Sequence, residues 1–243
     1  MIQKQIFRWF GIALYLMMTT IISQAQQSQG DKQALQQHIA QIKQSVAKNQ
    51  AALRKYTWTE TTEISLKGEV KKRTKKECHY GPDGTVVKTP IEGEQSQQSG
   101  GKKPRGLRGK IVEKKVDELK DYGERFGSLI RHYVPPDPDR MRASFQAGNA
   151  SLEGGGGEAA LGFKDYYKQG DKVTLTFDTA AKQIRGYDVA SFLDGPKDVA
   201  TLTAKFANLD DGTNYVSETV LDSQEKQLRI RITNTDHRKT AAK

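Results

Sequence analysis

The chain has 243 residues and a formal net charge of +10 at pH 7. Only 35% of the residues are hydrophobic, which predicts a modest core, or a sheet with one face in water. The single cysteine, Cys78, excludes an internal disulfide, so packing alone must hold the fold together. We expect its thiol to be buried and inert, with an intermolecular bridge as the alternative.

Residues 1–25 have the pattern of an export signal. Lys4 and Arg8 give a positive start, and an apolar run follows over residues 12–22. Small residues then precede a cleavage site near Ala25, so we expect a periplasmic protein. An uncleaved anchor is the alternative, although the apolar run is shorter than the about 20 residues of a membrane-spanning helix.

The remainder, residues 26–243, is expected to form one domain. Apolar residues on one narrow stripe predict a first helix from Asp31, a suitable N-cap, to Arg54. Alternation of apolar and polar residues, broken by turn signals, then predicts a meander of three strands. These strands are Tyr56–Leu66, Val70–Tyr80 and Thr85–Ile91.

The middle of the chain is predicted to be partly helical. Residues 92–109 are rich in Gln, Ser, Gly and Lys and indicate a mobile loop. Apolar residues at helical spacing predict a long helix that begins at about Leu107 or Lys110 and extends to Val134, where a proline-rich segment ends it. A short helix over Asp139–Ala147 and a glycine-rich flexible link at residues 148–158 follow.

The last third of the chain consists of short alternating segments separated by turn residues. Such spacing is typical of an antiparallel sheet, a barrel or a partial barrel. The predicted strands cover residues 173–178, Gln183–Leu193, Ala200–Leu209, Asn214–Asp222 and Gln227–Asn234.

Three fragments carry a resemblance to a known family: Tyr56–Thr61, Tyr80–Gly84 and Asp171–Leu193. With the order of leader, helix, meander, helical insertion and second run of strands, the layout resembles the LolA/LolB-like group of periplasmic lipoprotein carriers and its RseB/MucB-type relatives. The resemblance implies an α+β fold with a strongly curved antiparallel sheet, a half β-barrel. The N-terminal helix and the long central helix would pack on or across its concave face. Its apolar interior would accept an acyl chain, a lipid or a lipidated protein.

Large aromatic and apolar side chains are the candidates for contact with such a ligand. Two interpretations stay open for them, ordinary core packing or the wall of an apolar pocket. The candidate ligand-binding residues are Tyr56, Trp58, Ile64, Tyr166, Tyr167, Phe177 and Phe192.

A basic run on the second strand is the candidate contact for a charged partner. It is either a solvated strand face or a site for an acidic protein or anionic lipid headgroups, worth about 1 kcal/mol per basic residue at such a surface. Nucleic acid is not an expected partner, because the chain is exported and no aromatic residues alternate with the run. The basic run consists of Lys71, Lys72, Arg73, Lys75 and Lys76.

No motif indicates catalysis, a metal or a cofactor. The four histidines lack metal-ligand spacing, and Gly154–Gly157 lacks the Lys-Ser/Thr of a phosphate-binding loop. We therefore expect a non-enzymatic carrier that holds apolar groups without a metal or cofactor. The alternative is a periplasmic protein-interaction or sensor module with a self-filled core and a basic contact face.

Overall fold

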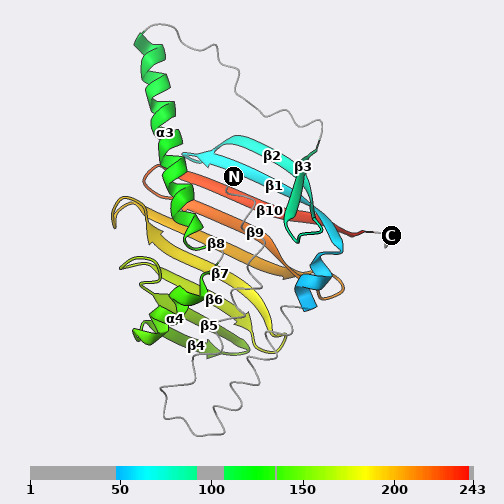
Figure 1. Ribbon diagram of the computed structural model, residues 1–243. Helices are drawn as coiled ribbons and strands as arrows, with labels where there is room; N and C mark the ends of the chain where they lie inside the picture. Colours follow the sequence, from blue (N-terminus) through cyan, green and yellow to red (C-terminus); the bar gives the residue numbers. More distant parts are fainter. Residues whose placement is uncertain (1–47, 92–106, 135, 241–243) are drawn as a thin grey trace.

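The computed structural model describes residues 48–91, 107–134 and 136–240 (Figure 1). Ten antiparallel strands form one sheet in the order β3-β2-β1-β10-β9-β8-β7-β6-β5-β4. The two edge strands, β3 and β4, lie at opposite ends of this open sheet, which is consistent with the expected half-barrel (Figure 1). The strands are β1 Tyr56–Leu66, β2 Glu69–Tyr80, β3 Val86–Pro90, β4 Ala150–Gly155, β5 Glu158–Lys164, β6 Lys172–Asp178, β7 Gln183–Phe192, β8 Val199–Asn208, β9 Asn214–Ser223 and β10 Leu228–Lys239.

One face of the sheet, called the apolar face below, carries most of the core. Side chains alternate between the two faces along each strand, and direct partners on neighbouring strands share a face. The pairing register therefore sets one row of apolar residues across eight strands, from β1 to β4. This row is Ile64, Ile230, Leu221, Leu202, Val189, Val173, Phe163 and Ala150.

The opposite face, called the polar face, carries threonines and charged side chains. Its charges pair between neighbouring strands, which reduces the repulsion expected from a basic chain. Examples are Arg73 with Glu63, Arg185 with Asp178 and Arg229 with Asp222.

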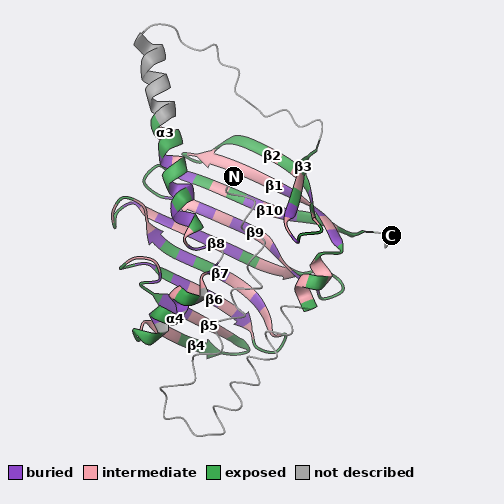
Figure 2. Ribbon diagram, viewed as in Figure 1, coloured by how far each residue is buried: buried purple, intermediate pink, exposed green. Residues whose placement is uncertain are grey.

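Two helices follow β3 and pack on the apolar face: α3, Leu107–Arg131, and α4, Pro138–Gln146. Both confirm predicted helices, with boundaries shifted by a few residues. The second half of α3 is buried against the sheet (Figure 2), where Tyr122, Phe126 and Ile130 join one cluster with the core residues of β6 to β9. No helix among the described residues combines the length and apolarity needed to cross a membrane.

The N-terminal helix is described only at its end, residues 48–53. The Asn49 side chain holds this end against the start of β9, because its amide nitrogen donates to the Asn214 carbonyl at 2.7 Å and its oxygen accepts from the Asn214 N–H at 2.6 Å. The predicted leader, the first part of this helix and residues 92–106 of the predicted loop lie outside the described residues. The last three residues of that predicted loop, 107–109, belong instead to α3.

The glycine-rich stretch at residues 148–158 corrects one prediction. It is not a link but forms β4 and the turn into β5, and β5 itself was not predicted. Gly156 and Gly157 both have positive φ, 64° and 95°, as a two-residue hairpin turn requires. The glycines therefore close a hairpin, and a compositional signal for flexibility was in fact a signal for a tight turn.

Candidate functional site

Two tyrosine hydroxyls, one on α3 and one in the turn directly after it, hold this segment against the sheet. Tyr133 donates to the Asp171 carboxylate at 2.6 Å and lies 2.8 Å from the Ser191 hydroxyl. The Tyr133 carbonyl accepts a hydrogen bond from the Tyr187 hydroxyl of β7 at 2.6 Å. Burial and the neighbouring Asp171 raise the pKa of Tyr133, so its hydroxyl stays a proton donor.

The second of these hydroxyls belongs to Tyr122, which lies within α3. Tyr122 donates to Asp198 at 2.6 Å, directly before β8, and its hydroxyl also contacts the Ser223 hydroxyl at the end of β9. The Tyr122 side chain is 1% exposed, and burial raises its pKa. Both tyrosines thus supply hydrogen-bond donors to buried carboxylates under this segment.

Asp171 organises the loop between β5 and β6. Besides the hydrogen bond from the Tyr133 hydroxyl, its carboxylate accepts hydrogen bonds from the backbone N–H groups of Tyr166, Tyr167 and Lys168 at 2.6, 3.0 and 3.0 Å. The aspartate is 2% exposed, so four donors stabilise a charge that burial alone would disfavour. These hydrogen bonds fix the backbone of the loop that carries Tyr166 and Tyr167.

The candidate ligand-binding residue Tyr167 lies between an aromatic ring and a cationic side chain. The His132 ring stacks on it at 3.9 Å between centroids, and the Arg140 guanidinium lies 4.6 Å from its ring centre. Burial first, and then the charges of Arg140 and Arg131, lower the pKa of His132. The imidazole therefore favours its neutral form at this position.

The structure brings some of the predicted ligand-binding residues together and separates others. Tyr166, Phe177 and Ile64 share the main cluster, in which Ile64 is half-buried. Phe192 is half-buried at the end of β7, with the Lys168 ammonium 3.8 Å from its ring centre. Tyr56 lies at the far end of β1, where its hydroxyl donates to Asp211 at 2.7 Å.

Trp58 belongs to a separate apolar cluster with Cys78, Val86 and Tyr80. Its ring stacks against His237 of β10 at 6.1 Å. Cys78 is fully buried, as expected from the sequence, and burial raises the pKa of its thiol to about 11. The aromatic residues of β1 thus lie apart from those at the β5–β6 loop.

A buried ion pair between the two clusters was not predicted. Glu60, 1% exposed, lies on the apolar face and pairs with Lys88 of β3, whose side chain is 10% exposed. Glu60 occupies the same strand face as Trp58 and Thr62. A charged residue at an apolar position of the alternation was the signal in the sequence that could have found this pair.

The basic run divides between the two faces of β2. Arg73 and Lys71 form ion pairs with Glu63 and Glu69, so part of the positive charge is compensated within the chain. Lys72 lies directly opposite Ile64, at the margin of the apolar face. The run is exposed at Lys71, Lys72, Arg73 and Lys75 and half-buried at Lys76.

Comparisons with known proteins concern the fold. No protein-family model matches the chain, and no curated protein matches it. Similar solved structures include a DUF1329 family protein from Desulfovibrio piger, with 12% identity over 82% of this chain and 92% of that one and a TM-score of 0.38. They also include a LolA superfamily protein from Nitrosomonas europaea, with 11% identity over 82% of this chain and 94% of that one and a TM-score of 0.33. Both TM-scores are below 0.5, so these likenesses say nothing of a ligand for this chain.

Proposed function

We propose that the chain is an exported, non-enzymatic carrier that holds an acyl chain, a lipid or a lipidated segment against the apolar face of its sheet. The observation that supports this function is the continuous apolar row from β1 to β4 on a sheet that is open. Toward β1 the row includes residues that are only half-buried, Ile64 and Ile230, with Leu66 beside them. The proposed ligand lies along these residues on the concave side of a half-barrel, with α3 as the neighbouring wall.

The binding energy of such a ligand would come from removing its methylene groups from water. Each buried methylene contributes about 0.8 kcal/mol, so shortening a fully bound fatty acid by two carbons weakens binding roughly 15-fold. Delipidated full-length chain titrated with fatty acids of 12, 14 and 16 carbons tests this dependence. Equal affinities, or no saturable binding, would contradict the carrier.

A matched pair of variants locates the binding surface. Ile64 and Ser65 are neighbours on β1, and their side chains lie on the apolar and the polar face. We expect Ile64→Gln to weaken fatty-acid binding at least five-fold, because it places an amide against the apolar ligand, while Ser65→Gln leaves binding unchanged. Thermal unfolding of both variants separates this loss from a loss of fold.

A protein-interaction or sensor module is the second candidate, and the filled packing under α3 favours it. Tyr122, Tyr133 and Tyr187 are at most 1% exposed there, so this part of the apolar face is occupied by the chain's own side chains. In this case the basic run would bind an acidic partner. Delipidated protein would take up no fatty acid, and changing Lys71, Lys72, Arg73, Lys75 and Lys76 together to Glu would abolish partner capture.

A further inference from the structure

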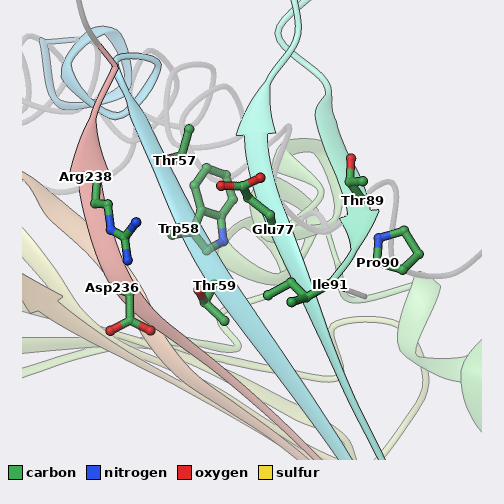
Figure 3. Close-up of a pocket in the computed structure, with 9 residues that line it drawn as sticks. All are labelled: Thr57, Trp58, Thr59, Glu77, Thr89, Pro90, Ile91, Asp236 and Arg238. Carbon is green, nitrogen blue, oxygen red and sulfur yellow. The ribbon is translucent and has the colours of Figure 1, made fainter. Parts of the chain in front are cut away.

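A second candidate site lies on the polar face, away from the surface proposed for lipid. It is a groove over β10, β1, β2 and the end of β3 (Figure 3), with a cavity volume of about 280 Å³. That volume is near the lower limit of small-molecule pockets, about 300 Å³, and so suits a single ring rather than a long chain. The lining residues are Thr57, Trp58, Thr59, Glu77, Thr89, Pro90, Ile91, Asp236 and Arg238.

A β-bulge shapes one wall of the groove. Thr57 pairs with Arg238 and Thr59 with Thr235, so one residue of β1 faces two residues of β10. Asp236, in the bulge, has a φ of 53°, which is uncommon for a residue other than glycine. Asp236 and Arg238 therefore both line the groove, and strained backbone of this kind concentrates at functional sites.

The charged groups of the groove lack the pairing seen elsewhere on the polar face. Among the described residues, neither Glu77 nor Arg238 forms an ion pair, and Asp236 accepts a side-chain hydrogen bond from its neighbour Thr235 at 3.0 Å. Arg73 with Glu63 and Arg229 with Asp222 show that this sheet readily pairs opposite charges across strands. Carboxylates and a guanidinium that line one groove without neutralising each other are available to a ligand.

We propose that this groove binds a small, uncharged, polyhydroxylated ring of the monosaccharide class. Carboxylates only accept hydrogen bonds, a guanidinium only donates them and threonine hydroxyls do both, so the hydroxyl groups of a sugar match every polar group present. An anionic ligand would lie against Glu77 and Asp236, and a cationic one against Arg238. Pro90 and Ile91 supply an apolar edge for the C–H face of a ring.

Trp58 provides a measurement of binding, because it is one of the residues that line the groove, and its ring packs on the other side of β1 with Cys78 and Val86. The chain has two tryptophans, so full-length protein with Trp9→Phe reports from Trp58 alone. We expect titration with a panel of neutral monosaccharides to give a saturable fluorescence change for at least one of them. Calorimetry with the same sugars detects binding that leaves the fluorescence unchanged.

Three variants test the assigned contacts. Glu77→Gln, Asp236→Asn and Arg238→Gln should each weaken sugar binding about ten-fold or more, because each removes a charge-assisted hydrogen bond. Asparagine tolerates the positive φ of Asp236. The control Glu153→Gln, an exposed residue on β4, should bind like the unchanged protein.

The proposal is overturned if no neutral sugar binds by either method, if only charged amino acids or phosphates bind, or if Glu77→Gln binds as tightly as Glu153→Gln. Fatty-acid binding measured on the same variants keeps this result separate from the carrier function. The two surfaces lie on opposite faces of the sheet, so one function can fail while the other stands.

Discussion

Tyr122 on α3 and Tyr133, two residues after the end of this helix, lie 11 positions apart, and each donates its hydroxyl to an aspartate directly before a strand. Asp198 precedes β8 and Asp171 precedes β6. The separation of these two tyrosines thus matches the spacing of alternate strands in the sheet, because only β7 lies between β8 and β6. The helix is therefore held in place by directed hydrogen bonds as well as by apolar contact.

Tyr122→Phe should lower the free energy of unfolding by about 1–3 kcal/mol, because it removes a buried hydroxyl and leaves the Asp198 carboxylate without that donor. Urea unfolding measures the change. Tyr167→Phe is the matched control, since the Tyr167 hydroxyl makes no hydrogen bond within the described residues, and it should change stability little. Equal effects would show that the Tyr122 hydroxyl is not an anchor.

Asp171→Ala should be more destabilising, by at least about 3 kcal/mol, because it leaves three backbone N–H groups and the Tyr133 hydroxyl without their acceptor. Asp188→Ala, at an exposed position on the polar face of β7, should stay within about 0.5 kcal/mol of the unchanged protein. A loss at Asp171 as small as the loss at Asp188 would contradict the central role of this carboxylate.

The Cys78 thiol should react slowly with a thiol reagent in the folded protein. Burial raises its pKa to about 11, and its exposure is 0%, so both the thiolate fraction and access are low. We expect labelling at pH 8 to be about a hundred-fold or more slower than that of a free thiol, and to become fast in denaturant. Rapid labelling of native protein would contradict the buried position.

Stability should fall as pH decreases below about 6.5, partly through His237. Burial lowers its pKa in the folded protein, where its ring packs 4.1 Å from that of Tyr215. Between the lowered folded pKa and the unfolded value of about 6.5, the unfolded chain binds more protons, so acid favours unfolding.

His237→Gln should therefore reduce the difference in unfolding free energy between pH 7.5 and pH 5.5. Urea denaturation at the two pH values measures this difference. If the variant shows the same difference in unfolding free energy as the unchanged protein, other groups cause the acid sensitivity. His132, whose pKa burial also lowers, is then the next residue to test.

The alternation of side chains and the turn residues largely determined the sheet. The predicted strands from Tyr56 to Tyr80 and from Gln183 to Asn234 overlap β1, β2 and β7 to β10, and only Leu193, Leu209 and Gln227 fall outside them, because period-two burial is a local property of each segment. The helix ending at Val134 was predicted because the helical spacing of its apolar residues is likewise a local property. Local composition failed at residues 148–158, where two glycines serve a hairpin turn rather than a flexible link.

Only the tertiary structure decided which distant residues meet. The pairing of β1 with β10 joins the two ends of the described chain, places Glu60 beside Asn234 and creates the bulge at Asp236. The contacts of Tyr122 with Asp198 and of Tyr133 with Asp171 depend on how α3 crosses the sheet. Such contacts depend on strand order and register, which are cooperative properties of the whole fold and leave no periodic trace in any single segment.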